Sequence, residues 1–398
     1  MYLKRTLEKK LKEANEFFKV IILTGPRQVG KTTLLEKIRE DNRTYVSLDD
    51  MDALLLATED PVLFFEKFKP PVLIDEVQKA PNLFIYIKAI VDKSNQTGQF
   101  WLTGSQQFHL MKNVSESLAG RAAIINLQGF SISETQEDTT RASFVPEIDL
   151  QTKRPIFSTS EIFEKIVNGS YPQLVDGTPK DLFYSSYIKT YIEKDIREIV
   201  NISNENNFLK FLRVIASRTS QTINYNDIAN DVGISPNTVK SWISVLETSG
   251  LIYLLQPYFN NLTKRAIKTP KLYFLDTGLC SYLMGIKDAD VAEQTSVNGA
   301  LFETYVVSEI LKSYWHNAKT PWIYFYRDAL GKEIDVLIEE NGKIYPIEIK
   351  KTSTPTKTMA SNFNIIDHKK RGKGAIVCAA KQFIPIDKEL NIIPVSYI

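Results

Sequence analysis

A nine-residue segment, GPRQVGKTT at positions 25–33, constrains the fold of this chain more than any other feature. It fits in full the pattern of Gly, four residues, Gly-Lys and then Thr or Ser. The apolar segment KVIIL precedes it, and TTLLEKIRE has the spacing of a helix. A glycine-rich turn between a buried strand and a helix directs its backbone N–H groups at phosphate oxygens. We therefore predict a P-loop on a parallel sheet, with ATP and Mg²⁺ as its ligands.

Each residue type in this loop has an expected role. Lys31 reaches the β- and γ-phosphates, and the Thr32 hydroxyl binds magnesium. Because the backbone of the whole segment surrounds the phosphates, every residue in it is a candidate nucleotide contact: Gly25, Pro26, Arg27, Gln28, Val29, Gly30, Lys31, Thr32 and Thr33.

Polar side chains follow two further apolar segments of the first 135 residues. Asp75 and Glu76 follow PVLI, and Thr103 and Ser105 follow QFWL. Function in parallel sheets gathers at the carboxyl ends of the strands. We expect Asp75 to bind the magnesium ion through water, and Glu76 to polarise the attacking water. Thr103 and Ser105 are placed to touch the γ-phosphate or that water, although a hydroxyl-capped turn explains them almost as well.

Arg121, in SLAGRAA, is a candidate for neutralising charge on the transferring phosphoryl group. It would do so from its own chain or from a neighbouring subunit of a homo-oligomer. An ordinary surface arginine is an equally good interpretation of the sequence.

Several motifs occur in a fixed order along the chain: GPRQVGKTTLL, the strand end Leu48-Asp49-Asp50, LIDEVQKAP, LTGSQ, SLAGR, YIEKDI and PKLYFLDTGL. Together they resemble a family of prokaryotic AAA-type ATPases whose members carry a C-terminal domain of uncharacterised function. The resemblance covers most of the chain and implies ATP hydrolysis. It also places Arg121 at a recurrent Gly-Arg position, which implies that Arg121 senses nucleotide. Lys194 stands where the family leads us to expect arginine, so a contact there would lose its fork geometry.

The chain of 398 residues, 43% of them hydrophobic, is long enough for two or three cores. The fold class that we predict is α/β, with a P-loop parallel-sheet ATPase domain, a helical and winged-helix middle module, and an α/β nuclease-like C-terminal domain. The expected bounds are 1–135 for the ATPase domain, 136–160 for a linker or peripheral loop, 161–258 for a helical region with a winged helix at 219–258, 259–298 for a connecting segment, and 299–398 for the C-terminal domain.

Residues 225–246 have the spacing of a helix-turn-helix, and LIYLL after Gly250 fits the first strand of a wing. The segment resembles a winged helix. Its candidate DNA contacts are Asn237, Thr238 and Lys240 on the second helix, followed by Lys264, Arg265, Lys268 and Lys271. A protein that binds DNA over its whole surface is usually strongly basic, whereas this chain has a formal net charge of +2. Any contact with DNA is therefore local. With one cation on that helix, docking of protein is as good an interpretation as binding of DNA.

The hairpin EIDVLIEENGKIYPIEIKK is the most informative stretch after the P-loop. Its Asn341-Gly342 turn predicts that Glu340 pairs with Lys343, which places Asp335 opposite Glu348. By alternation one face carries Glu333, Asp335, Glu348 and Lys350, and the other carries Ile334, Val336, Ile338, Ile347 and Ile349. Opposed carboxylates destabilise a hairpin, and a divalent cation removes that cost. The alternative is the solvated outer face of an amphipathic hairpin.

Glu303 adds a carboxylate on the apolar stripe of a helix predicted at 299–314. Glu303, Asp335, Glu348 and Lys350 together resemble the helix acid, metal acids and lysine of the PD-(D/E)XK nuclease superfamily. This short and degenerate motif implies that the three acids hold Mg²⁺ or Mn²⁺. It also implies that Lys350 orients the water or stabilises the transition state.

Two functions follow from these patterns. The first is an ATP-dependent enzyme that acts on DNA with a winged helix and a metal nuclease. The second is an ATP-operated switch or assembly protein whose C-terminal domains only bind partners. A transcription regulator is a weaker third, because the recognition helix carries one cation. The charged N-terminus, the absence of a long apolar run and two distant cysteines favour a cytoplasmic protein that binds no membrane.

Overall fold

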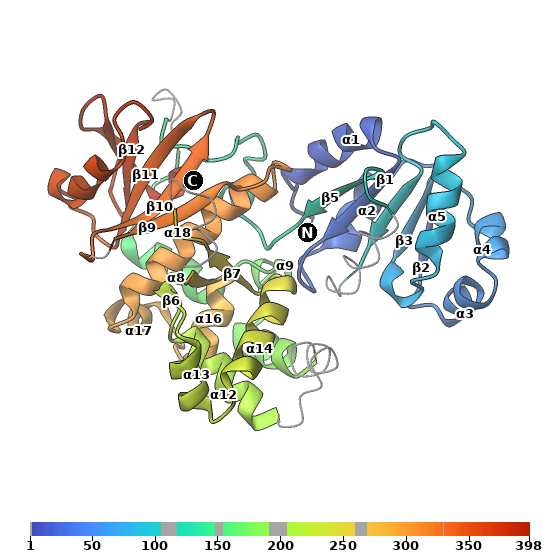
Figure 1. Cartoon of the computed structure of the whole chain (residues 1–398), viewed down its shortest axis with the longest axis horizontal. Coiled ribbons are helices and arrows are strands. Elements are labelled where there is room, and N and C mark those ends of the chain that lie inside the picture. The colour runs from blue at the N-terminus through green and yellow to red at the C-terminus, as the bar shows by residue number, and fades with distance from the viewer. Residues whose placement is uncertain (1, 105–117, 148–153, 191–204, 259–268, 329) are drawn as a thin grey trace.

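The computed structural model describes residues 2–104, 118–147, 154–190, 205–258, 269–328 and 330–398 (Figure 1). Five residues named above lie outside these ranges: Ser105, Lys194, Lys264, Arg265 and Lys268. Within the described ranges, no helix combines the length and the apolar character needed to cross a membrane.

The N-terminal part is built on five parallel strands in the order β2-β3-β4-β1-β5, which confirms the predicted parallel sheet. The strands are β1 Val20–Thr24, β2 Thr44–Ser47, β3 Val72–Asp75, β4 Phe100–Thr103 and β5 Ala122–Asn126. Apolar residues of α1 (Leu7–Phe17) and α2 (Lys31–Ile38) share a cluster with one face of the sheet. Those of α3 (Met51–Glu59), α4 (Pro61–Lys67) and α5 (Leu83–Asp92) share a second cluster with the other face.

Helices α1, α3 and α4 and strand β5 were not predicted from the sequence. Helices α3 and α4 had a usable sequence signal, because Asp50 and Asp60 cap them by accepting hydrogen bonds from Ala53 N and Leu63 N at 2.9 and 3.0 Å. Strand β5 had a weak sequence signal, since it is an edge strand that begins with two alanines and buries one residue.

The middle of the chain is helical, as predicted. Its helices are α8 Thr159–Asn168, α9 Pro172–Val175, α10 Lys180–Tyr187, α12 Glu205–Ala216, α13 Tyr225–Val232 and α14 Pro236–Thr248. Two further helices, α16 Thr277–Leu283 and α17 Ala289–Gln294, lie in the segment 259–298 that was predicted only as a connection. Gly233 ends α13 with φ of 85°, which a glycine adopts without strain. A small antiparallel sheet in the order β6-β8-β7 accompanies these helices, with β6 at Gln221–Thr222, β8 at Lys271–Phe274 and β7 at Ile252–Leu255. The wing sheet is the name used for it below, and the assignment of a winged helix stays a prediction.

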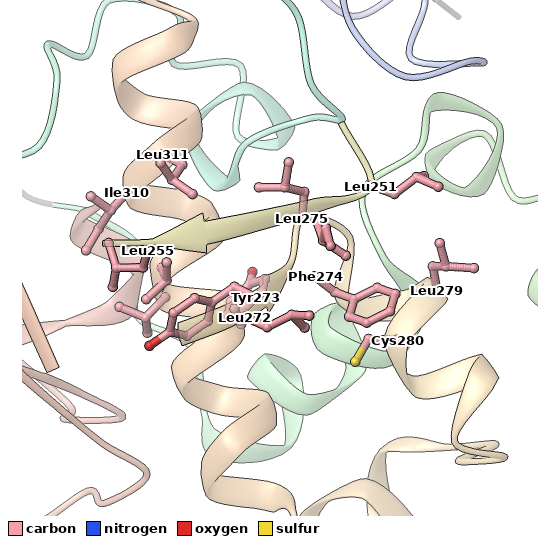
Figure 2. Packing of buried hydrophobic residues seen from close by; sticks show 14 of the residues in the cluster. Leu251, Leu255, Leu272, Tyr273, Phe274, Leu275, Leu279, Cys280, Ile310 and Leu311 are labelled. Atoms are coloured by element: carbon pink, nitrogen blue, oxygen red, sulfur yellow. The ribbon is translucent and has the colours of Figure 1, made fainter. Parts of the chain in front are cut away.

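The C-terminal part combines a long helix with a mixed six-stranded sheet in the order β13-β14-β12-β11-β10-β9. Its elements are α18 Asn298–Trp315, β9 Ile323–Arg327, β10 Glu333–Glu340, β11 Lys343–Lys350, η3 Lys357–Ile365, β12 Gly374–Cys378, β13 Ile384–Pro385, β14 Leu390–Pro394 and η4 Val395–Tyr397. The short helix α7 Ile132–Thr135 follows β5 at the end of the N-terminal part. Strands β13 and β14 were not predicted from the sequence. Figure 2 shows side chains of β7 and β8 packed among residues of α16 and α18, so the wing sheet and this part share a core.

The predicted hairpin register is confirmed from Glu340–Lys343 to Val336–Ile347. The placement of Ile334 with Val336 was wrong, because Ile334 belongs to a different apolar cluster. A shift in the β9–β10 pairing between Ile334 and Leu337 breaks the strict alternation of faces. The interpretation as a solvated face was also wrong, since Asp335 and Glu348 are only 7% and 8% exposed.

Candidate functional site

The loop between β1 and α2 has the shape that phosphate binding requires. Gly25 has φ of 144°, and a Cβ at this position would lie 2.0 Å from the carbonyl oxygen of Leu127. Only glycine therefore fits here. The Lys31 ammonium is buried and donates to the carbonyl oxygens of Gly25 and Pro26 at 2.9 and 2.8 Å. Burial lowers the pKa of Lys31 to about 8, although the carboxylates of Glu76 and Asp75 oppose that shift.

A pocket of about 480 Å³ opens at this loop. Its lining joins the P-loop to the ends of the neighbouring strands and consists of Arg27, Gln28, Gly30, Lys31, Thr32, Thr33, Asp49, Glu76, Gln78 and Lys79. Asp49 and Lys79 form an ion pair of 2.5 Å in this lining. Gln78 and Lys79 of this lining had no predicted role.

Asp75 and Thr32 meet at the carboxyl edge of the sheet. The Thr32 hydroxyl donates to Asp75 Oδ2 at 3.0 Å, so the two predicted magnesium-binding groups are adjacent. Tyr45 also donates to Asp75 Oδ2, at 3.4 Å. Burial raises the pKa of Asp75 to about 6, and the charge of Glu76 adds to the shift. A hydroxyl beside a buried carboxylate fits the ligand preference of magnesium.

This raised pKa predicts that MgATP binding weakens in acid. Below about pH 6 Asp75 takes up a proton and loses the charge that attracts the magnesium shell. We expect Kd to rise about tenfold for each unit of pH below that value. Calorimetric titration at pH 7.5 and pH 5 measures the change. An Asp75→Asn variant is the control for titration of ATP itself, and an equal pH dependence in that variant would contradict the role of Asp75.

Glu76 follows β3 in a left-handed backbone conformation, with φ of 55° and ψ of 39°. Its amide N–H donates to Asp75 Oδ1 at 3.1 Å. Thr103 ends β4, the strand between β3 and β1, and is fully buried. Its hydroxyl has no hydrogen-bond partner among the described residues. The structure therefore brings Lys31, Thr32, Asp75, Glu76 and Thr103 to one edge of the sheet.

Arg121 lies at the other end of the parallel strands, away from the P-loop. Its carbonyl oxygen accepts from Val20 N at the start of β1, whereas the P-loop follows the end of that strand. Its guanidinium is 2.5 and 3.0 Å from the two carboxylate oxygens of Asp92. The option that Arg121 acts on the nucleotide of its own chain was wrong, because the length of the sheet separates the two. Contact with the nucleotide of a neighbouring subunit stays a prediction.

The C-terminal carboxylates form a second polar cluster, but its partners include residues of the wing sheet. Glu303 Oε1 accepts from Tyr273 at 2.6 Å and from Lys271 at 3.2 Å. Lys271 also pairs with Glu333 and is only 4% exposed. The expectation that Lys271 contacts phosphates was wrong, since its ammonium is buried among carboxylates.

Asp335 and Glu348 share Lys350. Lys350 Nζ lies 2.7 Å from Glu348 Oε1 and 3.7 Å from Asp335 Oδ2, and Ile349 N donates to the latter at 2.8 Å. Burial and the neighbouring carboxylates, Glu303 among them, raise the pKa of Asp335. Burial is also the main cause that raises the pKa of Glu348.

Among the described residues, no three His, Cys, Asp or Glu side chains are grouped so that they could hold a metal ion. The structure therefore does not assemble Glu303, Asp335 and Glu348 as the predicted three-ligand set, because Tyr273 and Lys271 hold Glu303. Glu348 Oε2 is buried without a hydrogen-bond partner in the described part of the chain. This atom and the Asp335 carboxylate fit a site with two protein carboxylates.

Apart from Lys271 on β8, the predicted DNA-contacting residues that the structure describes lie on α14. Asn237 and Lys240 are exposed, and the Lys240 ammonium is 5.5 Å from the centroid of the Tyr225 ring. The preceding helix α13 exposes Asp227 and Asp231. The described surface of the helix-turn-helix is thus poor in positive charge.

The P-loop contacts other parts of the chain that the sequence analysis did not connect to it. A Cβ at Gly250, directly after the helix-turn-helix, would lie 3.2 Å from the Pro26 ring. Arg5 donates to the carbonyl oxygen of Val29 at 3.2 Å and pairs with Glu134, whose carboxylate lies 3.2 Å from His316 Nδ1. No local pattern could have found these contacts, because they join distant segments.

The Glu134 carboxylate is completely buried in this network. Burial alone would raise its pKa, but Arg5 and His316 hold that pKa well below its usual range. Two residues of α18, Glu309 and Lys312, bind the adjoining backbone: Glu309 accepts from Ile132 N at 2.8 Å, and Lys312 donates to Phe130 O at 2.9 Å. The N-terminal part and α18 are therefore joined by hydrogen bonds between buried charged side chains of α18 and the backbone at Phe130 and Ile132.

Three family models match the chain in succession. Residues 17–136 match a model described as AAA domain. Residues 159–290 match Domain of unknown function (DUF8612), and residues 298–398 match Domain of unknown function (DUF4143).

Two relatives with similar sequences have names that state no function. Uncharacterized protein Rv2008c of Mycobacterium tuberculosis is 26% identical over 399 residues, which cover 99% of this chain and 84% of that protein. Uncharacterized protein MJ1637 of Methanocaldococcus jannaschii is 26% identical over 314 residues, which cover 70% of this chain and 65% of that protein.

Among solved structures, the Walker-type ATPase PABY2304 of Pyrococcus abyssi is 17% identical, with a TM-score of 0.43 over 69% of this chain and 94% of that one. AMPPCP-bound DnaA from Aquifex aeolicus is 15% identical, with a TM-score of 0.29 over 70% of this chain and 90% of that one. The matched AAA domain together with the P-loop geometry identifies the N-terminal part as a P-loop ATPase domain of the AAA type.

Proposed function

We propose that this protein binds ATP with magnesium at the P-loop, hydrolyses it, and acts on DNA through its winged helix and a metal-dependent, nuclease-like C-terminal domain. The observation that carries the first part is the meeting of Lys31, Thr32, Asp75 and Glu76 at one edge of the sheet. The DNA-directed part has its support in the buried pair Asp335 and Glu348 with Lys350.

At the P-loop, each side chain has one task in hydrolysis. Lys31 leaves the carbonyl oxygens of Gly25 and Pro26 and binds the β- and γ-phosphates, since charge-assisted bonds to phosphate are stronger than bonds to neutral carbonyls. Thr32 and Asp75 would hold the magnesium ion, which neutralises phosphate charge when bound. Glu76 polarises the water whose oxygen bonds to the γ-phosphorus while the bond from that phosphorus to the bridging oxygen breaks.

At the C-terminal cluster, Asp335 and Glu348 would hold a divalent cation, which supplies charge stabilisation at a phosphodiester when bound. Lys350 is then released from Glu348 and orients the water or stabilises the transition state. Tyr273 and Lys271 keep Glu303 fixed at the border of this cluster. Glu303 therefore acts as a neighbouring charge and not as a direct ligand.

Cleavage of DNA tests the second part. We expect the full chain to cut DNA in the presence of Mg²⁺ or Mn²⁺, and Asp335→Ala to lower the rate at least about 100-fold by removing a metal ligand. Gel analysis of single- and double-stranded DNA measures the rate of cleavage. Asp387→Ala is the control, because Asp387 is a carboxylate by the strand pair β13–β14, at the far edge of the same sheet. Equal cleavage by the Asp335 variant, or none by the unaltered protein, would refute a nuclease.

The second candidate is an ATP-operated switch or assembly protein. It is favoured by the contacts that join the P-loop to Gly250, Arg5 and Glu134, and by the low positive charge of the helix-turn-helix. In this case ATP changes the oligomeric state of a protein that cuts no DNA, and Arg121 contacts the neighbouring subunit. Light scattering with and without ATP, on the preparation used for the cleavage assay, separates the two functions.

A further inference from the structure

Gln78 is a buried residue of the nucleotide pocket that the mechanism above does not use. It lies in η1 (Val77–Lys79), two residues after Glu76, and lines the same pocket as Lys31. Its side-chain Nε2 donates a hydrogen bond to Glu76 Oε2. Because Gln78 is only 8% exposed, water screens this bond little.

The chemistry of the two groups decides which way the amide faces. An ionised carboxylate only accepts hydrogen bonds, so the NH₂ group must face Glu76 and Oε1 must face away from it. Oε1 is buried and has no hydrogen-bond partner among the described residues. A Cβ at Gly104 would lie 2.0 Å from Oε1, so a larger residue there would displace the Gln78 amide from its place beyond the end of β4. Gln78 thus spans the ends of β3 and β4.

The backbone around Glu76 is held as firmly as its side chain. Its left-handed conformation is uncommon for a residue other than glycine and persists where the surroundings enforce it. Asp75 Oδ1 accepts from Glu76 N at 3.1 Å, and Glu76 O accepts from Lys79 N at 3.0 Å. These bonds fix the main chain, and Gln78 fixes the carboxylate at its end.

We propose that Gln78 is a positioning residue for ATP hydrolysis, which holds the Glu76 carboxylate in the orientation that polarises the attacking water. This inference rests on the proposed function, because it gives Gln78 a part in the task of Glu76. A bond that only orients a catalytic group lowers the barrier of the chemical step and leaves binding of the substrate unchanged.

The experiment compares steady-state ATP hydrolysis by the full chain with that of three variants. Gln78→Ala is expected to lower kcat about 10- to 100-fold, the effect of one hydrogen bond to a charged group, with KM changed less than about twofold. Gln78→Glu has nearly the same shape but puts a second carboxylate beside Glu76, so its kcat should fall at least as far. Gln99→Ala is the control, because Gln99 is also buried but precedes the opposite end of β4, where its amide bonds Gln96 O.

An unchanged or raised kcat in Gln78→Glu overturns the inference, because the variant removes the donor and keeps the volume. A loss of similar size in Gln99→Ala also overturns it, since it would point to a general loss of structure. If the unaltered protein does not hydrolyse ATP, the proposed function fails. If it does and the Gln78 variants match it, only the role of Gln78 fails.

Discussion

Replacing Lys31 with alanine is expected to weaken binding of MgATP at least about 100-fold. The ammonium lies buried between the carbonyl oxygens of Gly25 and Pro26, where a phosphate oxygen of a bound nucleotide is within its reach. A hydrogen bond to a charged group contributes about 1.5–3 kcal/mol, and Lys31 would form such bonds to two phosphates. Calorimetric titration with MgATP gives both Kd values directly.

Lys37→Ala is the matched control, because Lys37 is an exposed lysine on the same helix. It should bind MgATP as the unaltered protein does. Nucleotide affinity that is equal in the Lys31 and Lys37 variants would contradict the assignment of the P-loop.

Glu76→Gln should leave the affinity for MgATP within about twofold and lower kcat about 100- to 10,000-fold, the usual contribution of a group that activates water. The substitution keeps the size of the side chain and removes its charge. Phosphate release at saturating ATP measures kcat, and titration measures affinity. Glu66→Gln changes an exposed glutamate on α4 and serves as the control. Near-normal phosphate release by the Glu76 variant would refute the role of this residue.

The grouping of Asp75 and Thr103 with the P-loop at one end of the strands was predictable because its parts are local. The P-loop is one uninterrupted segment, and Asp75 and Thr103 end short apolar strands, so the rule that parallel strands end at one edge placed them together. Arg121 was not predictable in the same way. Its position depends on β5, which has a weak strand signal and begins one residue after Arg121. Only the three-dimensional structure places it at the other end of the parallel strands.

The C-terminal cluster could be predicted from the sequence only in part. The Asn341-Gly342 turn fixed the register near it, but the irregular pairing beside Ile334 could not be inferred from an alternating pattern. Lys271 and Tyr273 reach Glu303 from the wing sheet, about 30 residues earlier in the chain, and neither belongs to a motif. The contact of Arg5 with Val29 and Glu134 is likewise a product of tertiary packing.

A crystal structure with a non-hydrolysable ATP analogue and magnesium tests the central claim most directly. We predict that the triphosphate lies in the P-loop, that Lys31 Nζ leaves the carbonyl oxygens of Gly25 and Pro26 for the β- and γ-phosphates, and that the ion lies beside Thr32 and Asp75. A nucleotide bound elsewhere, with Lys31 still hydrogen-bonded to its own loop, would contradict the account.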